Sequence, residues 1–462
     1  MKKSLTVKNI ILIIVLGLAG QLCWNMENQW FNTYVYAKIG PYPEIVTCML
    51  IFSALATAFS TFLFGTFTDR IGKRKPFLCI GYIVWGITTF IFGITDYLKG
   101  FAPLWFVSTM VVVADCVMSF FGSMGNDCAY SAWTTDILNE ENKGFIGTSI
   151  AVMPIVGTIV GTLLGGIIIN SLGYHIFFAI MGGIVSLIGI ICIFTMKDEP
   201  NIKINKNGSF WKQFFSNFNF KEFIKNHELV LVFIVLSVYF IGFNCFFAHI
   251  GNLFIYNYNF KESDFGIIEG GALMISIIIC LFFGKLLSKN IAPKLTLISI
   301  VIEVFGLITL TILSFNNLFD GNSIFSINNL PLFIGMIIVG VGYILFMQVI
   351  MIWAKELYPE DKRGQIEGVK IIFFVLIPMI FGSLISNVLI NLFGKETQID
   401  YGYGLVTGKA PNHILFIAGA IIIAFSLIPL YFVNKKYKER INNKTKDNGS
   451  PEFYGVLWGL EK

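Results

Sequence analysis

Charged side chains are scarce in this sequence. Only 13% of its 462 residues are Asp, Glu, Lys or Arg, whereas soluble globular chains carry about a quarter. Hydrophobic residues make up 55% of the chain and aromatic residues 16%. This balance excludes an ordinary soluble protein, and we expect the chain to reside in a lipid bilayer.

Several chemical signatures are missing as well. The sequence has no G-x-x-x-x-G-K-[ST] phosphate-binding loop and no Ser/His/Asp or Cys/His constellation at an aqueous position. Its eight cysteines lie in or beside apolar runs at no metal-ligand spacing, which is typical of packing residues. We therefore expect no enzyme, no cofactor, no metal site and no nucleic-acid partner.

Long apolar runs are abundant. A stretch of roughly 20 apolar residues is long enough to cross about 30 Å of hydrocarbon as a helix. We find twelve such runs, beginning near Asn9, Glu44, Phe77, Pro103, Ile146, Tyr174, His227, Ser263, Pro293, Leu330, Gln365 and His413. The first has no small-residue cleavage site and should remain as a helix. The predicted fold is an all-α integral membrane protein with twelve transmembrane helices.

The basic residues predict the orientation. If the N-terminus is cytoplasmic, 28 of the 33 Lys and Arg residues fall on the inner side, and five remain outside. Positive residues concentrate in cytoplasmic segments of membrane proteins. We therefore expect a multi-pass protein of the cell membrane, monomeric, with both termini in the cytoplasm.

One charged phrase occurs twice. "SAWTTDILNEENKGFIGT" at 131–148 and "MIWAKELYPEDKRGQIEG" at 351–368 match at an offset of 220 residues, which pairs Trp133 with Trp353 and Asp136 with Glu356. Parallel repeats of six helices are a transporter architecture. We expect two six-helix bundles related by a parallel pseudo-repeat, at 1–196 and 227–434, with a linker at 197–226 and a cytoplasmic tail at 435–462.

The linker carries aromatic residues at helical spacing, including Trp211, Phe214 and Phe215, among basic residues. This pattern predicts either an amphipathic helix on the inner membrane face or an exposed linker helix.

The segment "GTFTDRIGKRK" after the second span resembles the loop signature of the major facilitator superfamily, G-x-x-x-D-R-x-G-R/K-R-K. "GNDCAYSAWTTDI" and its echo "WAKELYPEDKRG" resemble the glycoside-pentoside-hexuronide:cation symporters and their sucrose-transporter-like relatives. The resemblance implies a gating role for Asp69, Arg70 and Gly72. Melibiose-permease-like members carry an acidic D-x-x-x-D-P pair in the second helix for sodium, which this chain lacks, so protons are favoured over sodium.

The repeated phrase supplies further candidates for a cytoplasmic gate. Acidic residues at a helix end, followed by a basic residue and glycine, can exchange partners when two halves rock. The predicted gate residues are Asp69, Arg70, Gly72, Asp136, Glu140, Glu356, Glu360 and Arg363.

Four acidic residues fall within predicted spans: Glu27, Asp115, Asp127 and Glu303. Carboxylates in hydrocarbon are costly unless paired, solvated or protonated, so each is a candidate for ion coupling. Glu27 and Glu303 could instead pair with a neighbouring helix, and Asp127 could anchor a helix end.

Polar side chains on three spans predict a binding site for a neutral sugar. Amides supply donors and acceptors, and an aromatic face stacks on a pyranose ring. The alternative for the amides is hydrogen bonding between helices. The candidates for substrate binding are Gln21, Trp24, Asn25, Asn28, Gln29, Asn32, Ser119, Asn126, Asn244 and His249.

The sequence therefore favours a secondary transporter that couples uptake of a sugar or glycoside to a cation, with protons preferred. The alternatives are an exporter of amphiphilic compounds or sugars, and a membrane sensor built on a transporter scaffold.

Overall fold

The computed structural model describes residues 6–137, 142–198, 204, 208–216, 220–283, 291–316, 318–319, 321, 323–358, 363–400 and 404–448. Within these residues, 12 helical stretches are long and apolar enough to cross a membrane. The prediction of twelve spans is confirmed. The largest shifts in their starts are three residues, at Ile327 against the predicted Leu330 and at Gly368 against Gln365.

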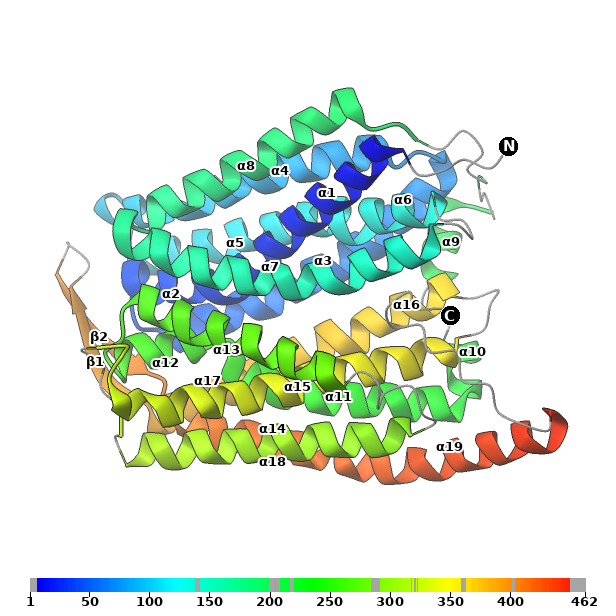
Figure 1. Cartoon of the computed structure of the whole chain (residues 1–462). Helices are drawn as coiled ribbons and strands as arrows, with labels where there is room; N and C mark the ends of the chain where they lie inside the picture. Colours follow the sequence, from blue (N-terminus) through cyan, green and yellow to red (C-terminus); the bar gives the residue numbers. More distant parts are fainter. Residues whose placement is uncertain are drawn as a thin grey trace. The chain divides into compact units, whose positions relative to one another are not determined.

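The chain divides into two compact units. The first comprises residues 1–217 with the short segment 396–408. Its elements (Figure 1) are α1 (Val7–Asn25), η1 (Met26–Phe31), α2 (Asn32–Tyr34), η2 (Val35–Ile39), α3 (Pro43–Ile71), α4 (Lys75–Gly93), η3 (Thr95–Gly100), α5 (Leu104–Gly122), η4 (Ser123–Tyr130), α6 (Ser131–Asp136), α7 (Lys143–Leu172), α8 (Tyr174–Thr195) and α9 (Phe210–Ser216).

The second unit begins at Phe218. Its helices are α10 (Lys221–Lys225), α11 (His227–Phe247), α12 (Ile250–Tyr256), α13 (Glu262–Phe283), α14 (Ala292–Phe315), η6 (Ile327–Asn329), α15 (Leu330–Glu356), α16 (Arg363–Ile371), η8 (Ile372–Leu376), α17 (Ile377–Phe393), α18 (Ile414–Phe425) and α19 (Leu427–Asn448). The last helix continues well past the apolar run into the predicted tail.

A short β-hairpin joins α17 to α18. Its strands are β1 (Lys395–Asp400) and β2 (Leu405–Ala410). Val406 and Gly408 of β2 lie against the turn at Gly40 and Pro41 of the first unit. Sequence analysis did not predict this hairpin, because its residues show no clear alternation of polar and apolar side chains.

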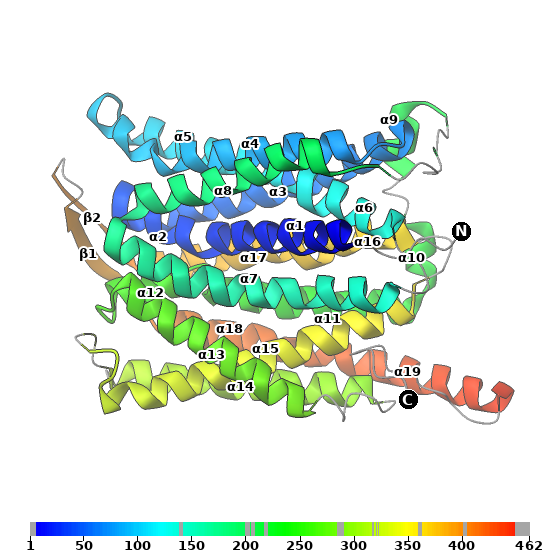
Figure 2. The ribbon, with the colours of Figure 1, turned by 45° about the horizontal axis from the view of Figure 1, so that its top comes forward.

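Glycines allow the helices of the first unit to pack closely. Helices α4 and α8 run side by side (Figure 2), and a Cβ atom at Gly86 would lie 2.2 Å from the carbonyl oxygen of Gly182. Small residues at helix contacts let backbones approach each other in membranes. Packing in this bundle therefore depends on the absence of side chains at these positions.

Two spans of the first unit contain π-helical turns: η1 and η2 interrupt the first span, and η4 interrupts the fourth. A π-helical turn inserts a residue and re-aims the side chains around it, and such turns are frequent at functional sites. Two acidic candidates, Glu27 and Asp127, lie in these turns.

The described part of the linker includes one short amphipathic helix, α9. Its Phe210 packs against Phe67 of α3, with ring centroids 4.5 Å apart. Trp211 and Phe215 point outward, 58% and 63% exposed. The linker is thus helical in this part. Phe210 packs on α3, and Trp211 and Phe215 lie on the exposed side of the helix.

Candidate functional site

The amides of the first span divide into two groups. Asn25 donates hydrogen bonds to Gln29 and to Thr162 of α7, at 3.4 and 3.1 Å, and Thr162 donates to Gln29 at 2.8 Å. Gly161 of α7 lies directly against Asn25. Asn25 and Gln29 are buried, so they tie α1 and η1 to α7. This is the interhelical hydrogen bonding that the sequence left as an alternative.

The second group stays accessible. Gln21, Trp24 and Asn28 are partly exposed and follow one another at helical spacing on one stripe of the span. Trp24 packs against Trp85 of α4, with ring centroids 5.0 Å apart. Asn32, another predicted substrate-binding residue of this span, is buried and donates to the carbonyl oxygen of Asn28 at 2.8 Å. Gln21, Trp24 and Asn28 are therefore the candidates on this span whose side chains are not fully packed against neighbouring helices.

Two of the predicted ion-coupling residues lie together inside the first unit. Glu27 and Asp115 are 6% and 1% exposed. The hydroxyl of Ser119, one turn after Asp115 on α5, donates a hydrogen bond of 2.7 Å to Oε1 of Glu27. Among the described residues, Oε2 of Glu27 and Oδ1 of Asp115 have no hydrogen-bond partner.

The charged surroundings of this pair are acidic. Within the described part of the chain, Glu27 acts electrostatically on Asp115, and Asp127 acts on Glu27. Two carboxylates that share a buried site can both stay ionised only if a cation binds between them. Otherwise one of them takes up a proton. The pair is therefore suited to bind one positive charge.

The polar residues near the end of the fourth span are engaged with neighbours. Asn126 accepts a hydrogen bond of 3.1 Å from Tyr82 and donates one of 3.2 Å to Asp127. Asn126 also lies directly against Gly20 of α1. Asn126 thus sits in a helix contact, and Asp127 is half-buried beside it.

In the second unit, Glu303 of α14 is fully buried and accepts a hydrogen bond from the hydroxyl of Tyr239 on α11. Gly342 of α15 lies against the backbone and Cβ of Glu303. Glu303 therefore contacts α11 through its carboxyl group and α15 through its backbone and Cβ. It lies in a different unit from the pair formed by Glu27 and Asp115.

The seventh span places its predicted residues differently. Asn244 is half-buried and donates to the carbonyl oxygen of Phe240 at 2.9 Å, whereas His249 is fully buried. Beside Asn244, the ring of Phe243 stacks on Tyr343 of α15, with centroids 4.8 Å apart. Of the two candidates, Asn244 is the more exposed.

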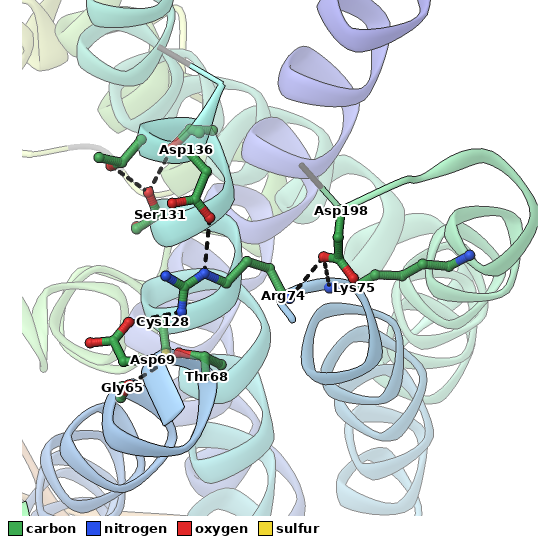
Figure 3. A network of polar contacts seen from close by, with 11 residues as sticks. Gly65, Thr68, Asp69, Arg74, Lys75, Cys128, Ser131, Asp136 and Asp198 are labelled. Atoms are coloured by element: carbon green, nitrogen blue, oxygen red, sulfur yellow. Dashed lines mark hydrogen bonds and ion pairs between the residues drawn. The ribbon is translucent and has the colours of Figure 1, made fainter. Parts of the chain in front are cut away.

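A charge network occupies the end of the first unit where α3 meets α4 (Figure 3). Arg74 donates to Asp69 at 2.9 Å and to Asp136 at 3.0 Å. Although burial opposes its charge, the hydrogen bond and charge of Asp136, together with Asp69, raise the pKa of the Arg74 guanidinium. Arg74 thus joins two of the predicted gate residues, Asp69 and Asp136.

Asp198, which follows α8, completes this network. Its Oδ1 accepts hydrogen bonds from the backbone N–H groups of Arg74 and Lys75, both at 2.8 Å (Figure 3). These N–H groups open α4, where an anionic side chain is favourable. Sequence analysis did not assign Asp198, although an acidic residue at the end of a span is a signal for such capping.

The other predicted gate residues have varied positions. Arg70 donates to the carbonyl oxygen of Gly208 and to Gln213 of α9, both at 3.0 Å, so it holds the linker helix. Gly72 ends α3 with a φ of 68°, a left-handed conformation that favours glycine. Glu140 and Glu360 lie outside the described residues. Arg363 begins α16, but its side chain is not described.

Twelve spans in two units of six, with buried carboxyl groups in both, define a helical membrane protein of the secondary-transporter class. The sequence matches the Major Facilitator Superfamily over residues 11–326, and the chain belongs to that family. It is a transporter, not an enzyme.

Solved structures share the fold. A mutant of the nucleoside transporter NupG matches with a TM-score of 0.66 and 12% identity, covering 92% of this chain and 99% of the other. NupG itself matches with a TM-score of 0.61 and 14% identity, covering 93% and 99%. The xylose transporter XylE from E. coli, in an inward open conformation, matches with a TM-score of 0.63 and 12% identity, covering 91% and 95%. Among curated proteins, none matches the chain in sequence.

Proposed function

We propose that the protein is a secondary active transporter of the cell membrane that couples uptake of a sugar or glycoside to a cation, with protons favoured. The observation that carries this proposal is the buried pair of Glu27 and Asp115 joined through Ser119. A buried pair of carboxylates that takes up one proton carries one negative charge instead of two, which lowers the cost of holding it in hydrocarbon while the protein changes conformation with its cargo.

The cytoplasmic placement of both termini belongs to this proposal. Twenty-eight of the 33 basic residues fall on that side under the predicted topology. The accessible stripe of Gln21, Trp24 and Asn28 supplies amides and an aromatic face for a ring with several hydroxyl groups. The branch proposed within the superfamily is the glycoside-pentoside-hexuronide:cation or sucrose-transporter-like one, on the motifs quoted above.

A nucleoside is a second candidate substrate. The stacked rings of Phe243 and Tyr343 next to Asn244 offer a flat aromatic surface with an amide beside it. Such a surface suits a base better than a sugar ring alone, because every base has a π face. The structural likeness to a nucleoside transporter favours including this class in the test.

The deciding experiment is uptake into proteoliposomes of radiolabelled xylose, melibiose, sucrose and uridine. Each solute is offered with an inward proton gradient, an inward sodium gradient, or neither. Accumulation of one sugar that requires the proton gradient is the expected result. Accumulation driven by sodium alone contradicts the preference for protons, and accumulation of uridine alone replaces the sugar by a nucleoside. A solute that only equilibrates contradicts cation coupling.

A further inference from the structure

A second charge cluster lies in the second unit, at the end where α11 begins and α15 finishes. Arg440 of α19 donates two hydrogen bonds to Glu228, the second residue of α11, at 2.9 and 3.1 Å. Trp353 of α15 donates its indole N–H to the same carboxylate at 2.8 Å. Three helix ends are therefore joined at one acidic group.

The geometry is that of a strong ion pair. Arg440 uses Nε and a terminal nitrogen against both oxygens of Glu228, which is the two-pronged arrangement that only an arginine provides. Glu228 is 7% exposed, so the loss of its partner would leave a buried charge. Tyr437, one turn earlier on α19, supports the guanidinium carbon from 5.3 Å.

The internal repeat gives this cluster a counterpart. Asp136 of the first unit corresponds to Glu356 of the second at the offset of 220 residues. Asp136 pairs with Arg74, which comes from the connection between α3 and α4. Glu356 lies 3.9 Å from Arg440 instead. Both units thus have an acidic residue at this position. Asp136 faces Arg74 of the α3–α4 connection, and Glu356 faces Arg440 of α19.

The sequence shows why the arginine of the second unit comes from α19. The stretch "FGKLLSKNIAPK", which corresponds to the loop carrying Asp69 and Arg74, has Ser288 in place of the aspartate and no arginine. Arg440 stands in the helical extension that α19 makes beyond its apolar residues. A residue of the C-terminal helix therefore occupies the electrostatic position that the loop fills in the first unit.

We propose that Arg440 holds the ends of α11, α15 and α19 together in the second unit, and that the extension of α19 thereby takes part in the conformational change of the transporter. When Arg440 engages Glu228, the ends of α11, α15 and α19 move as one body. When the pair opens, these ends separate, and the balance between the transporter's conformations shifts. This role concerns the conformational change of the transporter and does not depend on which cation or solute it carries.

The test uses the full chain in lipid nanodiscs and compares Arg440→Ala with Lys436→Ala. Lys436 makes an exposed ion pair with Glu439 on the same helix, so its loss controls for removal of a charge from α19. Hydrogen exchange is followed in peptides covering residues 227–235 and 350–356. We expect Arg440→Ala to raise exchange in both peptides by about tenfold or more, and Lys436→Ala to leave both unchanged.

A second measurement separates a working role from a merely structural one. Spin labels at Thr135→Cys and Lys355→Cys report the distance between the two units, after Cys48 and Cys116 are replaced, because the other six cysteines are buried. We expect Arg440→Ala to redistribute this distance. If Arg440→Ala does not fold, Arg440→Lys, which keeps the charge and loses the fork, carries the same comparison.

An unchanged distance distribution in Arg440→Ala or Arg440→Lys overturns the proposal. So does a rise in exchange confined to α19, because the extension would then be fraying without affecting α11 and α15.

Discussion

Ser119 of α5 donates a hydrogen bond of 2.7 Å to Glu27 of η1, although the two residues are 92 positions apart. Asp115 lies one turn before Ser119 on the same helix and is equally buried. The hydroxyl thus holds one carboxyl group at a fixed place near a second one. The proposed coupling of uptake to a cation depends on this link.

We expect Ser119→Ala to lower gradient-driven uptake about tenfold, because loss of a hydrogen bond to a buried charged group costs about 1.5 to 3 kcal/mol. Exchange of solute across the membrane without a gradient should fall less. Ser108→Ala is the control, since Ser108 lies on the same helix and bonds only to its own turn, at Leu104. Equal uptake in the two variants would place Ser119 outside the coupling machinery.

The two groups of amides on the first span should respond differently to alanine. Asn28→Ala should raise the KM for the transported solute about five- to tenfold, the equivalent of one lost hydrogen bond, and leave the melting temperature nearly unchanged. Asn25→Ala should lower the melting temperature, because Thr162 and Gln29 each lose the hydrogen bond that Asn25 donates. Thermal unfolding in detergent and initial uptake rates measure both. A change in KM from Asn25→Ala alone would reverse the assignment.

The twelve spans could be predicted because membrane helices can be recognised from the length and hydropathy of apolar runs alone. Tyr174 and His227 begin spans where the sequence placed them. The acidic candidates could also be found, since a carboxyl group within an apolar run is conspicuous. Their grouping could not, because the sequence does not show that Glu27, in the π-helical turn η1, lies beside Ser119 of α5.

Partners supplied by distant elements escaped the sequence altogether. Asp198 and Arg440 lie in a loop and a tail, where charged residues are common and carry no periodic signal. Their importance comes only from the helix ends that they reach, at Arg74 and Glu228. Thr162 was missed for a similar reason, because a single hydroxyl in an apolar helix gives no hint of the amides that face it.

Glu303 should prove to be a structural residue. Its carboxyl group accepts a hydrogen bond from Tyr239, and its backbone and Cβ lie against Gly342 of α15. Glu303→Gln keeps a neutral polar group of the same size, so we expect uptake and its dependence on the proton gradient to be retained. Glu303→Leu should lower stability by about 1 to 3 kcal/mol, because the buried Tyr239 hydroxyl loses its acceptor. Loss of proton-driven accumulation in Glu303→Gln would instead assign it to coupling.

Lys99, in the connection between α4 and α5, should make stability depend on pH. Burial lowers the pKa of Lys99 to about 8 from 10.5, helped by the positive charge of Lys38 and opposed by Asp96. Between these two values the unfolded chain binds more protons than the folded one, so stability rises with pH. The penalty is full below pH 8 and is relieved as pH approaches 10.5.

Thermal unfolding between pH 7 and pH 10 checks this expectation. Lys99→Met should be more stable than the parent at pH 7, and the difference should shrink toward pH 10. Lys99→Arg is the control, because a guanidinium stays charged throughout this range and should abolish the gain at high pH. A constant difference between Lys99→Met and the parent at all pH values would exclude titration of Lys99 as the cause.

The contact between the first span and α7 should tolerate little added volume. A Cβ atom at Gly161 would lie 2.4 Å from Oδ1 of Asn25, and one at Gly165 would lie 2.3 Å from Nε1 of Trp30. Neither neighbour can withdraw freely, because Asn25 is bonded to Thr162 and Trp30 to the carbonyl oxygen of Gly161. We expect Gly161→Ala to cost about 1 to 3 kcal/mol through overpacking.

Gly147 offers a matched control on the same helix, because a Cβ atom there would meet nothing within 4 Å. Gly147→Ala should be neutral or slightly stabilising, since alanine favours the helix by about 1 kcal/mol over glycine. Melting temperatures of the two variants, measured in one detergent, make the comparison. If Gly161→Ala melts as high as Gly147→Ala, the first span can move away from α7 without cost, and the hydrogen bonds of Asn25 and Trp30 do not fix its position.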